Sequence, residues 1–236
     1  MEIRNSTVLV TGAGRGLGAA YVELALSRGA KKVYAGARTP KATGQASVVP
    51  IKLDVGSAED IASAAALARD VDIVINNAGI ALPAGVATPE GEDALRRQLE
   101  TNVFGVLRVS QAFAPILARN GGGALVNMLS ALSWINAPAL SGYSASKAAA
   151  WGITNALRNE LRGQGTLVVG VHAGFIDTDM AKGFPGPKSS PADVARQVFD
   201  AIEAGQEEVL ADEVSRRLKA GLSAGAYLQP VGGASS

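Results

Sequence analysis

A tyrosine and a lysine four positions apart, Tyr143 and Lys147, form the pair in this sequence best suited to proton transfer. The residues that follow favour a helix with an apolar stripe, and positions i and i+4 of a helix lie on one face. A free tyrosine has a pKa of about 10 and exchanges protons poorly at neutral pH, but a neighbouring ammonium lowers that pKa. The spacing therefore indicates a tuned acid/base, although a core tyrosine beside a lysine that reaches solvent has the same pattern.

A glycine-rich turn supplies the second chemical feature. Gly12, Gly16 and Gly18 lie between an apolar run at 7–10 and a helical pattern at 17–28. Backbone N–H groups at a helix N-terminus bind pyrophosphate, and glycines let the phosphate approach the main chain. The turn predicts a dinucleotide site, although a tight turn without a ligand has the same composition.

The end of the second apolar run indicates which dinucleotide is bound. Domains that bind NAD usually carry an acid about 20 residues beyond the turn, for the ribose hydroxyls. Here the segment 35–38 has no acid and ends with Arg38, while Arg15 lies inside the turn. A guanidinium suits a 2′-phosphate. We therefore expect NADP(H) rather than NAD(H), unless both arginines are only surface charges.

Composition excludes several other kinds of site. The chain has 236 residues, 47% of them hydrophobic, and a net charge of +1, so neither nucleic acid nor a membrane surface is an expected partner. It has no cysteine and one histidine, His172, which leaves little room for a metal site or a Ser-His-Asp triad. We expect a cytoplasmic protein with one domain, residues 1–236, and keep two small domains as the alternative.

The elements that must position these side chains alternate between short apolar runs and helical patterns. Strands are predicted at 7–10, 32–35, 48–53 (an edge strand, because of Pro50), 72–75, 124–129, 166–171 and 208–211. Helices are predicted at 17–28, 57–69, about 92–119, from 143 onward, 191–204 and 215–222. The pattern predicts an α/β fold with a parallel sheet covered by helices on both faces, a mobile loop at 183–190 and a loose tail at 231–236.

Taken together, the motifs resemble the short-chain dehydrogenases/reductases over nearly the whole chain. The matching residues are Thr11-Gly12-x-x-x-Gly16-x-Gly18, Asn76-Asn77-Ala78-Gly79, Asn102, Ser130 and Tyr143-x-x-x-Lys147, with 13 residues from Ser130 to Tyr143 (143 − 130). The resemblance implies a single Rossmann-type doubly wound domain with a mostly parallel sheet of about seven strands. It also implies reversible hydride transfer between a carbonyl and a nicotinamide.

The same resemblance gives four residues catalytic roles. Tyr143 would exchange the proton with the substrate oxygen, and Ser130 would hydrogen-bond that oxygen. Lys147 would bind the nicotinamide ribose and depress the tyrosine pKa. Asn102 would hold a water that relays protons to Lys147. A non-catalytic NADP(H)-binding sensor and a non-redox dehydratase or epimerase are the alternatives.

Cofactor contacts are assigned partly from the turn and partly from the resemblance. They are Gly12, Arg15, Gly16, Leu17, Gly18, Arg38, Asp54, Val55, Asn77, Ala78, Gly79, Tyr143, Lys147, Gly174, Ile176 and Thr178. One departure is Ala173-Gly174, where the family usually has Pro-Gly; the loss of the proline loosens the backbone slightly. His172 beside it is interpreted as a strand residue rather than a catalyst.

The substrate side should consist of apolar residues. They are Leu82, Leu132, Trp134, Phe175, Met180 and Phe184. We therefore expect a small hydrophobic ketone or the matching secondary alcohol as substrate. A homodimer through the helices near 102–119 and 143–162 is expected. A homotetramer is the alternative, placed in doubt because 208–221 replaces the family's C-terminal acidic-Gly-Gly segment.

Overall fold

Seven short apolar segments form one sheet at the centre of the computed structural model, which describes residues 1–229. The strands are β1 (Thr7–Thr11), β2 (Lys32–Ala37), β3 (Val48–Lys52), β4 (Ile73–Asn76), β5 (Ala124–Met128), β6 (Leu167–His172) and β7 (Glu208–Leu210). They pair in the order β3-β2-β1-β4-β5-β6-β7, and every neighbouring pair is parallel. β1, β4 and β5 are buried along their whole length, as expected for the centre of a parallel sheet.

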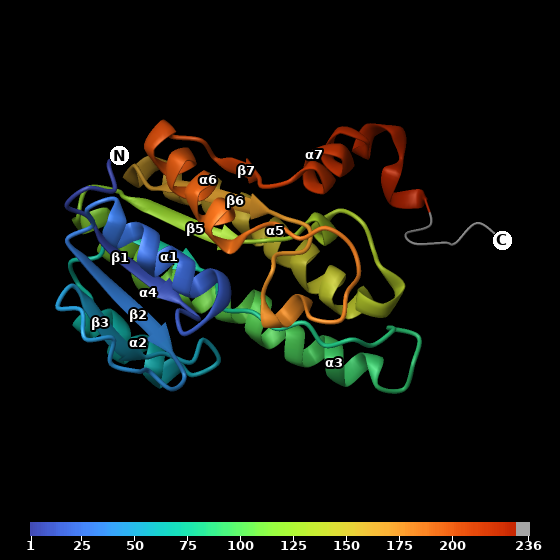
Figure 1. The fold of residues 1–236 in the computed structure, drawn as a ribbon, viewed down its shortest axis with the longest axis horizontal. Helices are drawn as coiled ribbons and strands as arrows, with labels where there is room; N and C mark the ends of the chain where they lie inside the picture. Colours follow the sequence, from blue (N-terminus) through green and yellow to red (C-terminus); the bar gives the residue numbers. More distant parts are fainter. Residues whose placement is uncertain (230–236) are drawn as a thin grey trace.

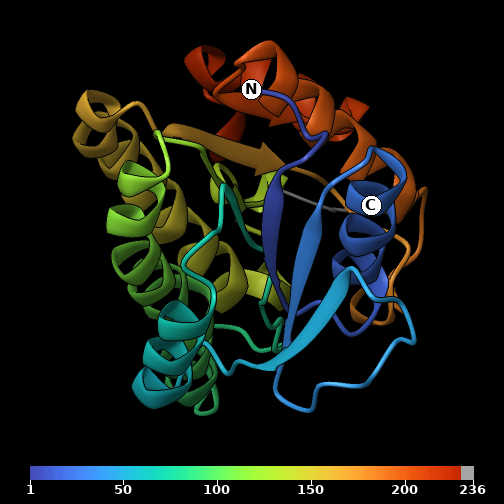
Figure 2. The ribbon, with the colours of Figure 1, turned by 90° about the vertical axis from the view of Figure 1, so that its left-hand side faces the viewer.

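Helices cover both faces of this sheet (Figures 1 and 2). They are α1 (Gly16–Ser27), α2 (Ala58–Leu67), α3 (Gly91–Leu99), α4 (Val106–Arg119), α5 (Ser141–Leu161), α6 (Pro191–Ala204) and α7 (Glu213–Ala220). One buried cluster joins α1 and α6 to the sheet, and a second joins α2, α4 and α5 to the opposite face. The predicted Rossmann-type fold, with about seven strands between two helical layers, is confirmed.

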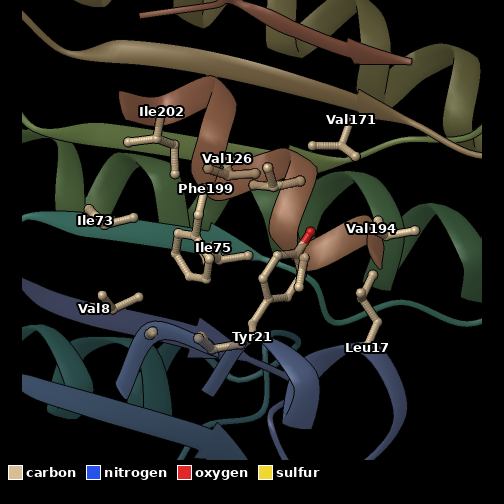
Figure 3. Packing of buried hydrophobic residues seen from close by; sticks show 14 of the residues in the cluster. Val8, Leu17, Tyr21, Ile73, Ile75, Val126, Val171, Val194, Phe199 and Ile202 are labelled. Atoms are coloured by element: carbon tan, nitrogen blue, oxygen red, sulfur yellow. The ribbon is translucent and has the colours of Figure 1, made fainter. Parts of the chain in front are cut away.

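Tyr21 occupies the centre of the cluster under α1 and α6 (Figure 3). Its ring meets Phe199 edge to face, with centroids 5.9 Å apart, a favourable arrangement for an aromatic pair. Its hydroxyl donates to the sulfur of Met128 at 3.1 Å, so the buried phenol has a partner. Met128 ends β5, and the core therefore contacts the strand that leads into the candidate site.

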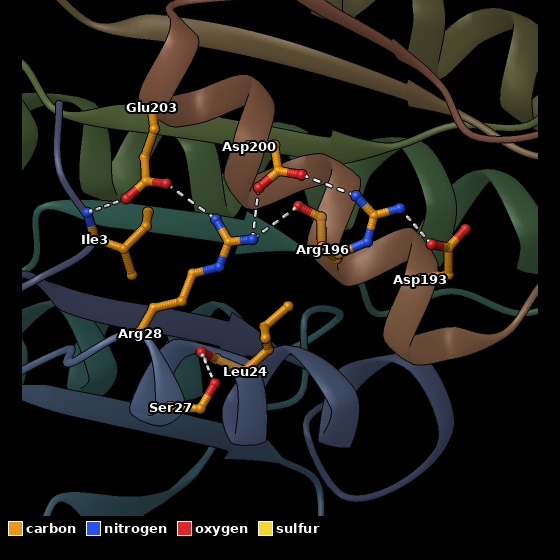
Figure 4. Close-up of polar contacts among 8 residues, drawn as sticks. All are labelled: Ile3, Leu24, Ser27, Arg28, Asp193, Arg196, Asp200 and Glu203. Atoms are coloured by element: carbon orange, nitrogen blue, oxygen red, sulfur yellow. Dashed lines mark hydrogen bonds and ion pairs between the residues drawn. The ribbon is translucent and has the colours of Figure 1, made fainter.

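An ion-pair network on the surface of the same layer joins α1 to α6 (Figure 4). Arg28 contacts Asp200 at 2.6 Å and Glu203 at 3.0 Å, and Glu203 also accepts from the backbone N of Ile3. The Arg28 side chain is only 20% exposed, so its stem packs while its guanidinium is paired. The network lies away from the motif residues and has a structural role.

The motif residues gather at the point where the strand order reverses, between β1 and β4. β1 pairs with β2 on one side and β4 on the other, which creates the crevice where such sheets bind ligands. The turn follows β1, Asn77 follows β4 and Ser130 lies two residues beyond β5. All these segments leave the carboxyl ends of parallel strands, so the topology collects them at one edge.

The boundaries differ from the sequence-based expectations at several points. The expected helix over about 92–119 is a continuous helical run, Gly91–Arg119, but it is not one α-helix, because a π-helical turn, Glu100–Gly105, lies between α3 and α4. The last helix begins at Glu213 rather than 215, because Asp212 caps it. Pro50 does lie in an edge strand, and Ser57 does cap α2. The predicted tail at 231–236 lies outside the described residues.

Within residues 1–229, none of the helices combines the length and the apolar character needed to cross a membrane.

Candidate active site

Tyr143 and Lys147 lie one turn apart on α5, as their spacing predicts. The ammonium nitrogen of Lys147 is 5.7 Å from the centre of the Tyr143 ring. Lys147 is 5% exposed, and its Nζ donates a hydrogen bond of 2.6 Å to the backbone oxygen of Met128. A buried ammonium that hydrogen-bonds a strand carbonyl gives up few protein contacts when it binds a ligand hydroxyl. Lys147 is therefore suited to bind a ligand.

Burial sets the protonation states of the pair. It raises the pKa of Tyr143 to about 12, while a side-chain hydrogen bond with Ser130 acts in the opposite direction. Burial lowers the pKa of Lys147 to about 8. Burial of the phenol is the largest cause, so the Tyr143 pKa of the free protein lies above its ordinary value of 10, and the expected lowering by Lys147 stays a prediction. At neutral pH the phenol carries its proton, as donation to a ketone oxygen requires.

Ser130 is fixed by contacts on each of its polar groups. Its hydroxyl caps a short 3₁₀ helix, Ala131–Ser133, by accepting from the N of Leu132 at 3.1 Å. Its backbone N donates to the Ser133 hydroxyl, and its backbone oxygen lies 3.0 Å from Nδ1 of His172. The Ser130 side chain is also close enough to the Tyr143 hydroxyl to lower the pKa of that phenol, so one substrate oxygen could contact both hydroxyls.

Asn102 lies in the π-helical turn that interrupts the predicted long helix. Its buried side chain exchanges two hydrogen bonds of 2.9 Å with the backbone N and O of Ile80. Its Nδ2 also donates to the Ser146 hydroxyl, which in turn donates to the backbone oxygen of Tyr143. π-helical turns are frequent at functional sites. Here the turn lets Asn102 join α5 to the segment that follows β4.

The glycine-rich turn packs against the segment after β4. The Thr11 hydroxyl accepts hydrogen bonds of 3.0 Å from the N of Asn77 and the N of Ala78. Gly12 has a φ of +65°, and a Cβ there would lie 3.0 Å from the Cα of Ala78. Gly16 has a φ of +54°, and a Cβ there would lie 3.0 Å from a methyl of Thr178. A side chain at either glycine would distort the turn.

The start of α1 is suited to an anionic ligand. No side chain caps its first turn, and that turn contains no acid. Arg15 is its N-cap residue and pairs with Asp179 at 3.0 Å, while Arg38 is exposed just beyond β2. Free N–H groups, the positive end of the helix dipole and two guanidinium groups fit the phosphates of a dinucleotide.

The other assigned cofactor residues lie along the same edge. A Cβ at Gly79 would lie 3.1 Å from Oδ1 of Asn102 and 3.8 Å from Nζ of Lys147, so a larger residue there would press on the Asn102 side chain. Val55 is buried against Gly105 at the start of α4, and Asp54 is half-buried beside it. The remaining assigned residues are Leu17, buried in α1, and Gly174 and Ile176, half-buried after β6.

Buried side chains hold the irregular segment 80–86 on the substrate side. Asn102 binds the backbone of Ile80, Gln98 accepts from the N of Leu82 at 2.9 Å, and Ser141 accepts from the N of Val86 at 2.9 Å. Gln98 is fully buried on α3 and was not identified from the sequence. The segment that carries Leu82 is thus positioned by polar contacts rather than by regular structure.

Apolar residues assigned to the substrate side meet on the loop after β6. Phe175 and Phe184 stack with centroids 5.0 Å apart, and Met180 on the same loop is 48% exposed. Leu132 is half-buried beyond Ser130. Trp134 differs, because it is only 9% exposed and its ring is enclosed by His172, stacked at 3.9 Å, and Trp151. A contact between Trp134 and substrate therefore stays a prediction.

Four residues of this region were missed by sequence reasoning. They are Gln98, Ser146, Asp179 and Asp212. Each acts through a partner far away in the chain, and nothing in the local sequence marks those partners. The one available signal was Asp212, an acid that precedes a helical pattern and is followed three residues later by Ser215, as in a capping box.

Comparisons with known proteins agree with this geometry. The sequence profile of the short chain dehydrogenase family matches residues 6–187. An oxidoreductase of Botryotinia fuckeliana is 35% identical over 73% of this chain and 66% of its own length. An uncharacterized oxidoreductase of Staphylococcus aureus is 30% identical over 85% of this chain and 92% of its own length. A crystal structure of a short chain dehydrogenase from Burkholderia cenocepacia in complex with NADP has a TM-score of 0.90 and 39% identity, with 95% of each chain covered.

Proposed function

Because this chain belongs to the short-chain dehydrogenase family, we propose that it is an NADP(H)-dependent oxidoreductase that interconverts small hydrophobic ketones and secondary alcohols. The observation that carries the proposal is the convergence of Tyr143, Ser130, Lys147 and Asn102 at one edge of the sheet. Their contacts join α5, the end of β5 and the π-helical turn into one hydrogen-bonded unit.

Proton transfer at the substrate oxygen falls to Tyr143. Its pKa of about 12 keeps the phenol protonated, so it donates to the oxygen of a ketone during reduction. The Ser130 hydroxyl holds the same oxygen and stabilises the negative charge that develops there. A bound nicotinamide supplies the hydride in this direction and accepts it in the other. Alcohol oxidation needs the phenol to lose its proton, and the ammonium of Lys147 and a positively charged nicotinamide would both favour that loss.

NADP(H) is the cofactor that the charges around the turn favour. Arg38 is free on the surface side of β2, and Arg15 could exchange the exposed carboxylate of Asp179 for a phosphate. Lys147 would donate to the nicotinamide ribose in place of the Met128 carbonyl. The similar B. cenocepacia dehydrogenase was solved in complex with NADP, which supports the choice.

The substrate class follows from the side chains assigned to the substrate side. Leu82, Leu132, Phe175, Met180 and Phe184 are apolar and come from three separate loops. Burying them against a hydrocarbon group stabilises binding by about 25 cal/mol per Å² of apolar surface. The proposal therefore keeps a small hydrophobic ketone or secondary alcohol.

Two further expectations are kept as proposals. A homodimer would form through α4 and α5. Phe104, in the π-helical turn just before α4, is 45% exposed, and Ala148, Ala149 and Gly152 of α5 are exposed small residues. A cytoplasmic location is the other.

The function is tested by steady-state turnover of the purified protein with NADPH and a panel of ketones of graded size and polarity. We expect net NADPH oxidation on small apolar ketones and weak activity on charged ones. Cofactor binding without turnover across the panel would favour the sensor. A tightly retained cofactor that is regenerated within each turnover would favour the dehydratase or epimerase.

A further inference from the structure

The carboxylate of Asp212 joins three segments of the chain beside the candidate active site. Its Oδ2 accepts a hydrogen bond of 2.6 Å from the N of Gly174 and one of 3.4 Å from the hydroxyl of Ser189. Its Oδ1 accepts one of 2.8 Å from the N of Ser215. All three donors are uncharged, so the carboxylate holds backbone and loop rather than an opposite charge. Hydrogen bonds to an ionised acceptor are the stronger kind.

The first of these segments carries Gly174, which the family resemblance assigns to the nicotinamide site. Gly174 lies two residues beyond β6, and a Cβ on it would lie 3.2 Å from Oδ2 of Asp212 and 3.5 Å from the Cβ of Val214. The preceding residue is Ala173, where the family resemblance leads us to expect a proline. The backbone here lacks the stiffness of a proline ring, and the bond from Gly174 to Asp212 restrains it instead.

The second segment is the loop at 175–189, which carries three apolar side chains of the substrate side. Its two ends are tied together, because the N of Ser189 donates to the oxygen of Phe175 at 2.8 Å and the N of Asp177 donates to the oxygen of Ser189 at 2.9 Å. The carboxylate of Asp212 holds both sides of this junction, through Gly174 and through the Ser189 hydroxyl.

The third segment is α7, which anchors the carboxylate. Asp212 and Ser215 form a reciprocal capping box at its start. The backbone of Ala211 is fixed by a hydrogen bond of 2.9 Å to the oxygen of His172. The acid is therefore held in place from both directions along the chain.

We propose that Asp212 is a positioning residue, which sets substrate and cofactor affinity by clamping Gly174 and the base of the 175–189 loop onto α7. Its effect on affinity rests on the proposed function, whereas the clamp itself does not. Asp212 does not reach the reacting atoms, so its loss should raise KM values far more than it lowers kcat.

Four variants separate the arms of the clamp, which are the hydrogen bonds that the Asp212 carboxylate accepts from Gly174, Ser189 and Ser215. Asp212→Asn keeps an acceptor for the cap of α7, since Asn caps helices as well as Asp does, but turns an N–H₂ group toward the N–H of Gly174. Asp212→Ala removes all arms. Ser189→Ala removes only the loop arm, and Ser215→Ala removes only the reciprocal cap, which makes it the matched control.

Limited trypsin digestion tests the clamp without cofactor or substrate. Lys182 and Lys188 are the cleavage sites within the loop, and fragment masses identify cuts after them. We expect Asp212→Asn to raise the rate of these cuts about tenfold, the scale of one charge-assisted hydrogen bond. Ser189→Ala should raise it by a smaller factor. Ser215→Ala should lower the melting temperature and leave the cutting rate unchanged.

Kinetics and binding test the consequence. We expect Asp212→Asn to raise KM for the ketone and Kd for NADPH about tenfold, with kcat within about threefold of the parent protein. The inference is overturned if Asp212→Asn behaves like Ser215→Ala, with a lower melting temperature but unchanged loop cleavage and unchanged NADPH affinity. A parent protein that turns over no ketone contradicts the proposed function alone, because the digestion and NADPH binding still decide the role of Asp212.

Discussion

The ammonium nitrogen of Lys147 lies 2.6 Å from the backbone oxygen of Met128, inside a buried site where no carboxylate among residues 1–229 forms an ion pair with it. The same methionine accepts the hydroxyl of Tyr21 on its sulfur, so the end of β5 contacts the core on one side and the candidate site on the other. A buried lysine without a counter-ion costs stability, and such groups concentrate at functional sites.

Lys147→Met should raise stability and lower function. Burial lowers the pKa of Lys147 from its ordinary value of 10.5 to about 8, so below pH 8 the folded state holds a charge that it disfavours. Removing the charge should increase the free energy of unfolding at pH 7, by up to about 3 kcal/mol. NADP(H) affinity and turnover should both fall, because the ribose loses a donor. Slowed turnover with unchanged cofactor affinity would disprove the ribose contact, and urea unfolding with NADPH titration measures both effects.

Cofactor affinity of the parent protein should depend on the same group. As the pH rises through about 8, Lys147 in the free protein loses its proton, and a neutral amine is the weaker donor. Kd for NADP⁺ should therefore increase above pH 8 and level off below it. Lys147→Met should show no such step when NADP⁺ is titrated between pH 6.5 and 9.5, and a step of equal size in both proteins would assign it to another group.

Arg38→Ala should weaken NADPH binding specifically. The guanidinium is exposed beside β2, where it can pair with a 2′-phosphate that NADH lacks. We expect KM for NADPH to rise about tenfold or more with KM for NADH little changed. Lys41→Ala, an exposed cation three residues further along, is the control and should change neither value. Equal efficiency of the parent protein with the two cofactors would contradict the role of Arg38.

His172 should make the protein less stable as the pH falls. Burial lowers its pKa from 6.5 to about 4, and its Nε2 is buried without a hydrogen-bond partner. Between pH 6.5 and 4 the unfolded chain binds a proton that the folded state does not, so stability decreases with falling pH in this window. His172→Asn can retain the bond to the Ser130 oxygen but cannot titrate. The free energy of unfolding of the parent protein, relative to that of His172→Asn, should be about 1 kcal/mol lower at pH 5.5 than at pH 7.5. A difference that does not change with pH would mean that the His172 pKa is the same in the folded and unfolded chain.

Gly16→Ala should disturb the phosphate-binding turn beyond the cost of its backbone angle. Gly16 and Gly44 both have positive φ, +54° and +71°, but only Gly16 has a close neighbour, the Thr178 methyl at 3.0 Å from a Cβ. Both alanine variants should lose about 1 kcal/mol of stability through the backbone. Only Gly16→Ala should also weaken NADPH binding, as calorimetry would show. Equal NADPH affinity in the two variants would mean that the turn at Gly16 does not contact the cofactor.

Local patterns predicted the elements and the motif positions correctly, because they depend on neighbours in the sequence. The apolar runs specified the strands, Pro50 marked an edge, and the spacing of Tyr143 and Lys147 placed them on one face of α5. The π-helical turn was missed, because the contact that Asn102 makes within it is with Ile80, 22 residues away.

The burial of the Tyr143 phenol was also missed, for a related reason. Sequence spacing shows a cation near the phenol but not how deeply the phenol is buried, and burial dominates its pKa. The hydrogen bond between Asp212 and Gly174 joins residues 38 positions apart, so the sequence alone could not predict it either.

Tyr143→Phe tests the proposed acid/base most directly. The variant lacks only the hydroxyl, so the fold and NADPH binding should be retained. With the best ketone of the panel, NADPH oxidation should fall by a factor of about 10³ or more, with Kd for NADPH within about twofold of the parent value. A Tyr143→Phe protein that reduces the same ketone at a rate close to that of the parent would contradict the assignment of Tyr143 as the proton donor.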